Sequence, residues 1–214
     1  MPAKINEREY RQINFGQIEI READDGRKIV EGYATTFDQE YTLYSVGDYE
    51  LRESIDRHAF DETDMKDVIM QYDHEGRVFA RKSNGTLQME ADDHGLKIRA
   101  DLGGTEIGRQ LYEEIKGGYT NKMSFGFTVT GQKTERTKDA EGKTTILRTI
   151  TKIGKLYDVS AVSLPANDAT EISSRTISDG LIAQAQEEIR AEEERQQRIG
   201  EIRKLLKGEQ TDDE

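Results

Sequence analysis

The stretch NKMSFGF, Asn121 to Phe127, belongs to a longer run in which apolar residues alternate with small or polar ones. The non-apolar positions of this run are Ser124, Gly126 and Thr128. A period of two is the pattern of a β-strand with one apolar face. On its other face, the glycine two residues after Ser124 is expected to leave the hydroxyl uncrowded, which a nucleophile needs.

Three segments of the chain combine alternating apolar and polar residues with turn signals. They are 16–37, 86–102 and 127–153, and each is predicted to be a β-hairpin; the third has a long charged tip around 138–142. Helices are predicted over 105–118, where Thr105 is the cap and Gly117 the stop, and, more briefly, over 52–63. The strands outnumber the helices and do not alternate regularly with them. We therefore expect a mainly β, α+β fold, with a closed or partly closed antiparallel barrel and helices packed outside it.

The composition narrows the class of protein. Of the 214 residues, 34% are hydrophobic and 35% are charged, and the formal net charge is −12. An acidic chain is poorly suited to neutralise nucleic-acid phosphates, so no nucleic-acid partner is predicted. No apolar run is long enough for a membrane span, and a soluble, cytoplasmic protein is expected. The absence of Cys rules out disulfides and thiolate metal sites.

The end of the chain differs from the body. From Thr176 onward there are 11 acidic and 6 basic residues. The residues 178–207 favour a helix, with apolar positions near both ends and a polar middle. We divide the chain into a main domain, 1–176, and a charged helical or disordered tail, 177–214. The tail is expected to be a solvated helix or weak coiled coil, too polar to be a core element.

Of the three His, His74 is the strongest candidate for chemistry. It follows the apolar strand 68–72, and a His at the end of a strand has a fixed backbone while its ring can reach a cleft. A structural role is nevertheless the commoner one for a lone His near a turn. His58 and His94 lie on a predicted short helix and in a turn, where solvent exposure explains them. None of the three shows metal-ligand spacing, so no metal or other cofactor is predicted.

Ser124 and Asp158 each have two interpretations. A strand serine commonly bonds only water, whereas a nucleophilic one needs a base, and SFG is not the Gly-x-Ser-x-Gly elbow of α/β hydrolases. Asp158 lies in the alternating strand 156–162, among small or apolar residues. Such a carboxylate is either solvated or paired, for example with a His that it holds in one tautomer.

Taken in order, these segments resemble the prohead (capsid maturation) serine proteases of tailed phages, a family related in fold to the herpesvirus assemblins. The resemblance covers roughly 32–172 and is specific as an ordered set, although no single piece is. The matching pieces are EGYATTFD (31–38), LRESIDRHAFDET (51–63), VIMQYDHEGRVFAR (68–81), GLKIRADL (95–102), EIGRQLYEEIKGGYTNKMSFGF (106–127) and LYDVSAVSLPANDATEI (156–172).

Carried over by residue, the resemblance implies that His74 is the general base and Ser124 the nucleophile. Assemblins use a second His after the serine, but no His follows Ser124 here. Asp158 stands where prohead proteases often have an acid, and it is assigned the orienting role. Glu75, next to the base, is the alternative.

The resemblance also implies a function and a location. The protein would be made in the host bacterial cytoplasm and packaged inside the procapsid. There it would cut the scaffold, or the scaffold-like arm of the major capsid protein, and itself. A homodimer is expected by analogy with assemblins. The tail is interpreted either as an encapsulation or scaffold-binding segment or as a solubilising end. The alternatives are a catalytically inactive capsid assembly or scaffolding protein with the same fold, and a different β-barrel hydrolase.

Overall fold

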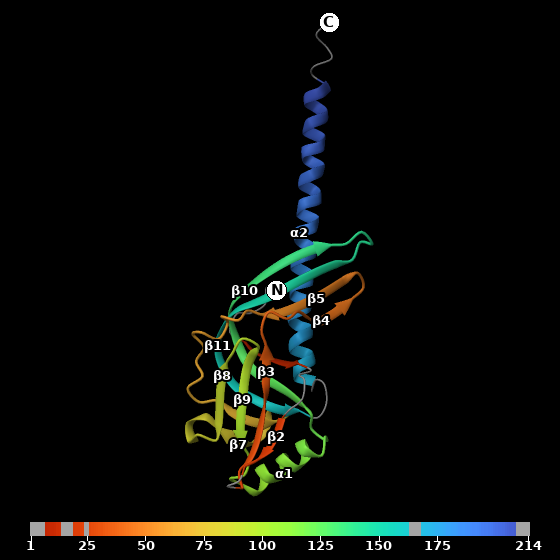
Figure 1. Ribbon diagram of the computed structural model, residues 1–214. Helices are drawn as coiled ribbons and strands as arrows, with labels where there is room; N and C mark the ends of the chain where they lie inside the picture. Colours follow the sequence, from red (N-terminus) through yellow and green to blue (C-terminus); the bar gives the residue numbers. More distant parts are fainter. Residues whose placement is uncertain (1–6, 14–18, 24–25, 163–167, 209–214) are drawn as a thin grey trace.

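The computed structural model describes residues 7–13, 19–23, 26–162 and 168–208. This part of the chain is mainly β-strand (Figure 1). The elements in chain order are β1 (Arg8–Ile13), β2 (Glu19–Glu22), β3 (Lys28–Thr36), β4 (Tyr41–Val46), β5 (Tyr49–Ile55), β6 (Ile69–Tyr72), β7 (Glu75–Arg81), the 3-10 helix η1 (Lys82–Asn84), β8 (Leu87–Ala91), β9 (Gly95–Asp101), α1 (Glu106–Lys116), β10 (Lys122–Lys138), β11 (Thr144–Val162) and α2 (Asp168–Gly208).

The described strands form two sheets. The larger has the order β1-β10-β11-β5-β4, with β6 and β7 attached to β11, and the smaller has the order β2-β3-β9-β8. The long strand β11 changes its neighbour along its length: Thr144–Ile150 runs parallel to β5, and Asp158–Ala161 runs parallel to β6.

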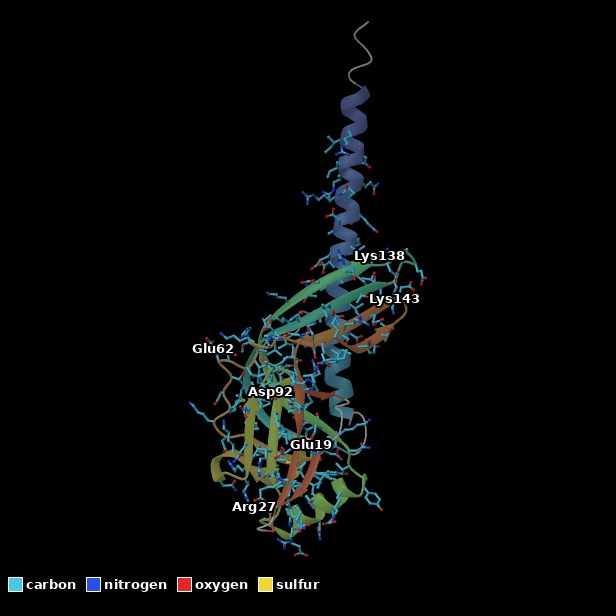
Figure 2. The ribbon with its side chains drawn as sticks, in the orientation of Figure 1. Glu19, Arg27, Glu62, Asp92, Lys138 and Lys143 are labelled. Carbon is cyan, nitrogen blue, oxygen red and sulfur yellow. The ribbon has the colours of Figure 1, made fainter. Side chains whose placement is uncertain are left out.

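The α+β class is confirmed, but the expected closed barrel is not found among the described strands. The physical reason lies in the β10–β11 ribbon. Its distal half extends away from the second sheet and pairs with β5 instead of curving back to close the sheet (Figure 1). Lys138 and Lys143 mark the tip of this ribbon, at the end of the body from which α2 projects and far from α1 (Figure 2).

The main core is formed where β10 and β11 face the second sheet and α1. Phe125 and Phe127 on β10 are fully buried, and their rings stack with centroids 4.5 Å apart. Ile98 of β9 and Leu111 of α1 belong to the same cluster. Full burial of such a side chain contributes roughly 1.5–3 kcal/mol, so the apolar face predicted from NKMSFGF fixes which way Ser124 points.

The three predicted hairpins are confirmed as β2–β3, β8–β9 and β10–β11. The predicted helix at 105–118 is confirmed as α1: the Thr105 hydroxyl accepts a hydrogen bond from the Gly108 amide at 3.0 Å, and the helix ends before Gly117. The predicted short helix at 52–63 is wrong. Its first residues belong to β5, because Leu51 and Ile55 are buried on one face of a strand that β11 pairs with, and residues 57–62 form turns.

The helix predicted in the tail is confirmed as α2, but its segment 181–185 is not solvated. Leu181, Ile182 and Ala185 are buried against a cluster that includes Leu51 and Ile146. Beyond them the helix projects from the body and its side chains are mostly exposed (Figure 1). The described helices include none that is long and apolar enough to cross a membrane.

Candidate active site

Neighbouring strands bring the three predicted site residues together. In the β10–β11 ladder, Ser124 lies opposite Ser160, and Gly126 lies opposite Asp158. On the other side of β11, β6 pairs with Asp158–Ala161, and the turn that follows β6 carries His74. The three side chains are thus held in place by the hydrogen bonds that join β11 to β10 on one side and to β6 on the other.

The His74 ring lies between the other two side chains. Its Nε2 is 2.5 Å from Ser124 Oγ, and its Nδ1 is 2.5 Å from Asp158 Oδ2. The acid in contact with the ring is therefore Asp158 and not the alternative, Glu75. The order hydroxyl, imidazole, carboxylate is the one in which an imidazole can take a proton from an alcohol.

The backbone at His74 is unusual. Tyr72 pairs with Glu75, so Asp73 and His74 form a two-residue hairpin turn with φ of 48° and 61°. Left-handed φ at both positions is typical of a type I′ turn, which favours Asn or Gly over His, and it costs about 1–2 kcal/mol per residue. The Asp73 amide donates a hydrogen bond to the Ala161 carbonyl at 3.0 Å. This bond ties the turn to β11 and thereby fixes where the imidazole lies.

Asp158 is completely buried, and its carboxylate is well supplied with donors. Ser160 Oγ donates to Oδ2 at 2.9 Å, and the Arg8 guanidinium contacts Oδ1. Burial alone acts to raise the pKa of Asp158. The hydrogen bond from His74, the charge of Arg8 and the Ser160 hydroxyl outweigh it, so the pKa lies below its ordinary value. An ionised carboxylate only accepts, so Nδ1 carries the ring hydrogen and Nε2 is left to accept from Ser124.

Gly126 has a different role from the one expected. A β-carbon at this position would lie 2.4 Å from Asp158 Oδ1 and 3.0 Å from the Arg8 guanidinium. The space beside the serine is therefore filled by this ion pair and is not open to a substrate. The expectation that the glycine leaves the hydroxyl uncrowded was wrong, because the residues that fill the space come from distant parts of the chain.

The N-terminal strand β1 covers the three side chains. Ser124 is 1% exposed, and the His74 side chain is 5% exposed. The Tyr10 ring packs on the His74 ring with centroids 4.5 Å apart, and Ser124 Oγ lies 3.0 Å from the Arg11 carbonyl oxygen. The strand β1 is not predicted by the sequence, since its residues show no apolar alternation.

A second cluster of charges lies on the other face of β1. Arg11 contacts Glu53 (Nε–Oε1, 2.5 Å) and Glu9 (2.5 Å), and Arg148 contacts the same two carboxylates at 2.7 and 2.8 Å. All four side chains are buried. Burial acts to raise the pKa of Glu53, but the charges of Arg11 and Arg148 and hydrogen bonds from Arg11 and Tyr41 bring it down to about 2.

The other two His residues lie apart from this site. His58 is exposed beside Asp61, and the His94 ring packs on Tyr33. Within the described residues, no group of three His, Asp or Glu side chains is placed to hold a metal ion. A cavity of about 610 Å³ is lined by the hairpin around His74, including Asp73 and Glu75, and by α1.

Comparison with known proteins identifies the family. The sequence model of the caudovirus prohead serine proteases matches residues 16–182, well over half of the chain. A search of curated proteins finds no match. A solved structure, the bacteriophage T4 capsid assembly protease gp21, aligns over 75% of this chain and 100% of its own, with 15% identity and a TM-score of 0.44. That likeness is too low to support an argument, and the assignment depends on the family match. The chain belongs to the caudovirus prohead serine protease family.

Proposed function

We propose that this chain is a serine endopeptidase in which Ser124, His74 and Asp158 act as a unit. Ser124 Oγ attacks the carbonyl carbon of a peptide while His74 Nε2 takes its proton, and Asp158 stabilises the resulting imidazolium. His74 then gives the proton to the leaving amine, and water hydrolyses the acyl-enzyme by the same steps. The observation that carries this proposal is the 2.5 Å contact between His74 Nε2 and Ser124 Oγ, with Asp158 on the other ring nitrogen.

The substrate follows from the family rather than from the site. We infer that the protein cleaves the scaffold, or the scaffold-like arm of the major capsid protein, and itself, inside the procapsid. The projecting, exposed part of α2 is consistent with a segment that binds scaffold or directs encapsulation. The division into a protease domain, 1–176, and a tail, 177–214, and the homodimer stay predictions.

One observation favours the rival function, a catalytically inactive capsid assembly protein. Ser124 is 1% exposed beneath β1, and a substrate carbonyl cannot reach a hydroxyl in that state. The rival predicts that this burial is permanent. The protease requires a state in which the strand has moved away.

Co-expression with the phage's major capsid protein and scaffold separates the two functions. The protease predicts that Ser124→Ala and His74→Ala each abolish processing, seen as a loss of the shorter capsid band. Two substitutions serve as matched controls. Ser45→Ala removes an exposed strand hydroxyl, and His94→Ala removes a ring that packs on a tyrosine as His74 does. Processing that persists in both of the first two variants would refute the proposed endopeptidase.

A further inference from the structure

The strand β1 presents two different faces to the body of the protein. Arg8 and Tyr10 lie over Asp158 and His74. Glu9 and Arg11 point the other way and join the buried charges of β5 and β11. Period-two alternation explains this division, since successive strand residues point to opposite faces. One strand therefore both closes the candidate active site and is anchored beside it.

The place of β1 is one that an extended peptide could occupy. It lies at the edge of the sheet, antiparallel to β10, and its Gln12 is opposite Ser124. The carbonyl oxygen of Arg11 is 3.0 Å from Ser124 Oγ. A hydroxyl has one hydrogen, so this carbonyl competes with His74 for it. Adding a strand at a sheet edge is a general mode of peptide binding, and here a peptide of the chain itself has taken the position next to the nucleophile.

The buried cluster of charges beside β1 can stay neutral when the strand is released from the sheet. With the strand in place, Glu9 and Arg11 balance each other, and so do Glu53 and Arg148. When β1 departs, this buried cluster loses one negative charge (Glu9) and one positive charge (Arg11), and the remaining Glu53–Arg148 pair, with a contact of 2.7 Å, stays neutral. An unpaired buried charge is strongly destabilising, whereas a complete pair is not. Release of the strand therefore leaves no isolated charge in this cluster. Asp158 loses its contact with Arg8 but keeps those with His74 and Ser160.

We propose that β1 is an internal occupant of the β10 edge at which an extended peptide substrate binds, and that this strand must leave before Ser124 can act. The strand lies outside residues 16–182, the part that the family model matches. The inference is therefore made for this chain and not for the family. It rests on the proposed function for the chemistry of Ser124, but not for the release of the strand.

A reversible cross-link tests whether release is required. The chain has no Cys, and Arg8 pairs with Thr128 in the β1–β10 register, so Arg8→Cys/Thr128→Cys can tie the strand down in the full chain. The readout is the rate at which a fluorophosphonate labels Ser124, whose oxygen displaces fluoride from phosphorus. We expect the oxidised form to label at least about tenfold more slowly than the reduced form, and dithiothreitol to restore the rate.

The control cross-link is Thr42→Cys/Arg52→Cys, a pair of exposed residues opposite each other in β4–β5. Oxidation of this control should leave the labelling rate unchanged. Equal rates for the oxidised and reduced forms of the β1 cross-link would overturn the proposal. The comparison is made within one variant, so the loss of Arg8 affects both forms alike.

A second measurement does not depend on catalysis. Hydrogen exchange is followed in full-length Ser124→Ala protein, with and without Glu9→Gln or Arg11→Gln. Each single change leaves a net charge in the buried cluster only while β1 is in place, so it should speed exchange of the β1 amides about tenfold or more. Exchange at Asp158–Ala161 in β11 should not change. The double variant Glu9→Gln/Arg11→Gln has a neutral cluster again, so the exchange rate of its β1 amides should be closer to that of the parent protein than in either single variant.

The outcomes separate the two proposals. If β1 amides exchange at the rate of β11 in every variant, the strand opens only with the whole fold and the inference is wrong. If the β1 amides exchange as expected but the fluorophosphonate labels Ser124 in no form of the protein, release of the strand is supported and the proposed endopeptidase function is refuted.

Discussion

Gly126 lies directly opposite Asp158 in the β10–β11 ladder, and a β-carbon on Gly126 would come within 2.4 Å of Asp158 Oδ1. The carboxylate can therefore reach His74 only because the residue facing it has no side chain. The absence of a side chain at Gly126 therefore makes room for the carboxylate of Asp158, and not for a substrate beside Ser124.

Replacement of this glycine should damage activity more than folding. In Gly126→Ala, the new methyl group displaces the Asp158 carboxylate and with it the His74 ring. Misplacement of a reacting group by about 1 Å costs about a hundredfold in rate, and we expect a loss of that size in capsid-protein cleavage. The control is Gly104→Ala, which meets no atom within 4 Å. A fully active Gly126→Ala protein would show that the carboxylate position is unimportant.

Removal of the charge on Asp158 should be more severe. In Asp158→Asn, the amide can donate to His74 Nδ1, which turns the hydrogen-bearing nitrogen toward Ser124 and leaves it unable to accept a proton. A change of this kind lowers kcat by about 10⁴ in a serine protease triad, and we expect a loss of that order with little change in KM. Steady-state kinetics on a peptide from the capsid cleavage site would measure it. A loss of less than about tenfold would argue against the orienting role.

If Ser160 positions the Asp158 carboxylate, its removal should affect the pH profile. Its hydroxyl donates to Asp158 Oδ2 at 2.9 Å and helps to lower the pKa of that carboxylate. In Ser160→Ala the carboxylate should protonate at a higher pH, so the acidic limb of the activity profile moves toward neutral. The loss of one hydrogen bond, about 1 kcal/mol, corresponds to roughly fivefold in rate. Ser160→Thr, which keeps a hydroxyl, should restore the profile; an unchanged profile in Ser160→Ala would contradict the role.

The buried charges should make stability depend on pH. The pKa of Glu53 falls from an ordinary value of 4.5 to about 2 in the folded protein. The folded state thus binds fewer protons than the unfolded one, and this stabilisation, about 3 kcal/mol, is fully present above pH 4.5 and is lost as the pH falls toward 2. Urea unfolding at a series of pH values should show this decline in the parent protein. It should be reduced in Glu53→Gln; an identical decline in both would refute the assignment.

The parts of the fold that the sequence predicts are those set by local patterns. The alternation around Ser124 identifies β10 because its apolar face meets a core, and Thr105 and Gly117 delimit α1 because caps act on neighbouring residues. The helix at 52–63 was wrong because pairing with β11, far along the chain, makes its first residues a strand. The prediction of a closed barrel was wrong for a similar reason. The strand β11 pairs with β5 along one part and with β6 along another, and no single segment of the sequence shows this.

The site shows the same division. His74, Ser124 and Asp158 could be named as candidates because each lies at a predicted strand or turn, but their roles came from the resemblance to the prohead proteases, since the patterns alone favoured a structural role. Their contact, and the turn that carries His74, depend on pairings between distant segments. The strand β1 was missed because Glu9 and Arg11 look like surface residues until their partners on β5 and β11 are known. Ser160 could have been found, since it lies on the same strand face as Asp158.

Activation of Ser124 by His74 can be measured by a mutant cycle on capsid-protein cleavage by purified protein. Residues that act as one unit are non-additive: once either is lost, the other has nothing left to contribute. If the two residues act as one unit, Ser124→Ala, His74→Ala and the double variant should all fall to the same residual rate. Two results would contradict it: cleavage retained by either single variant, or single losses that multiply in the double variant.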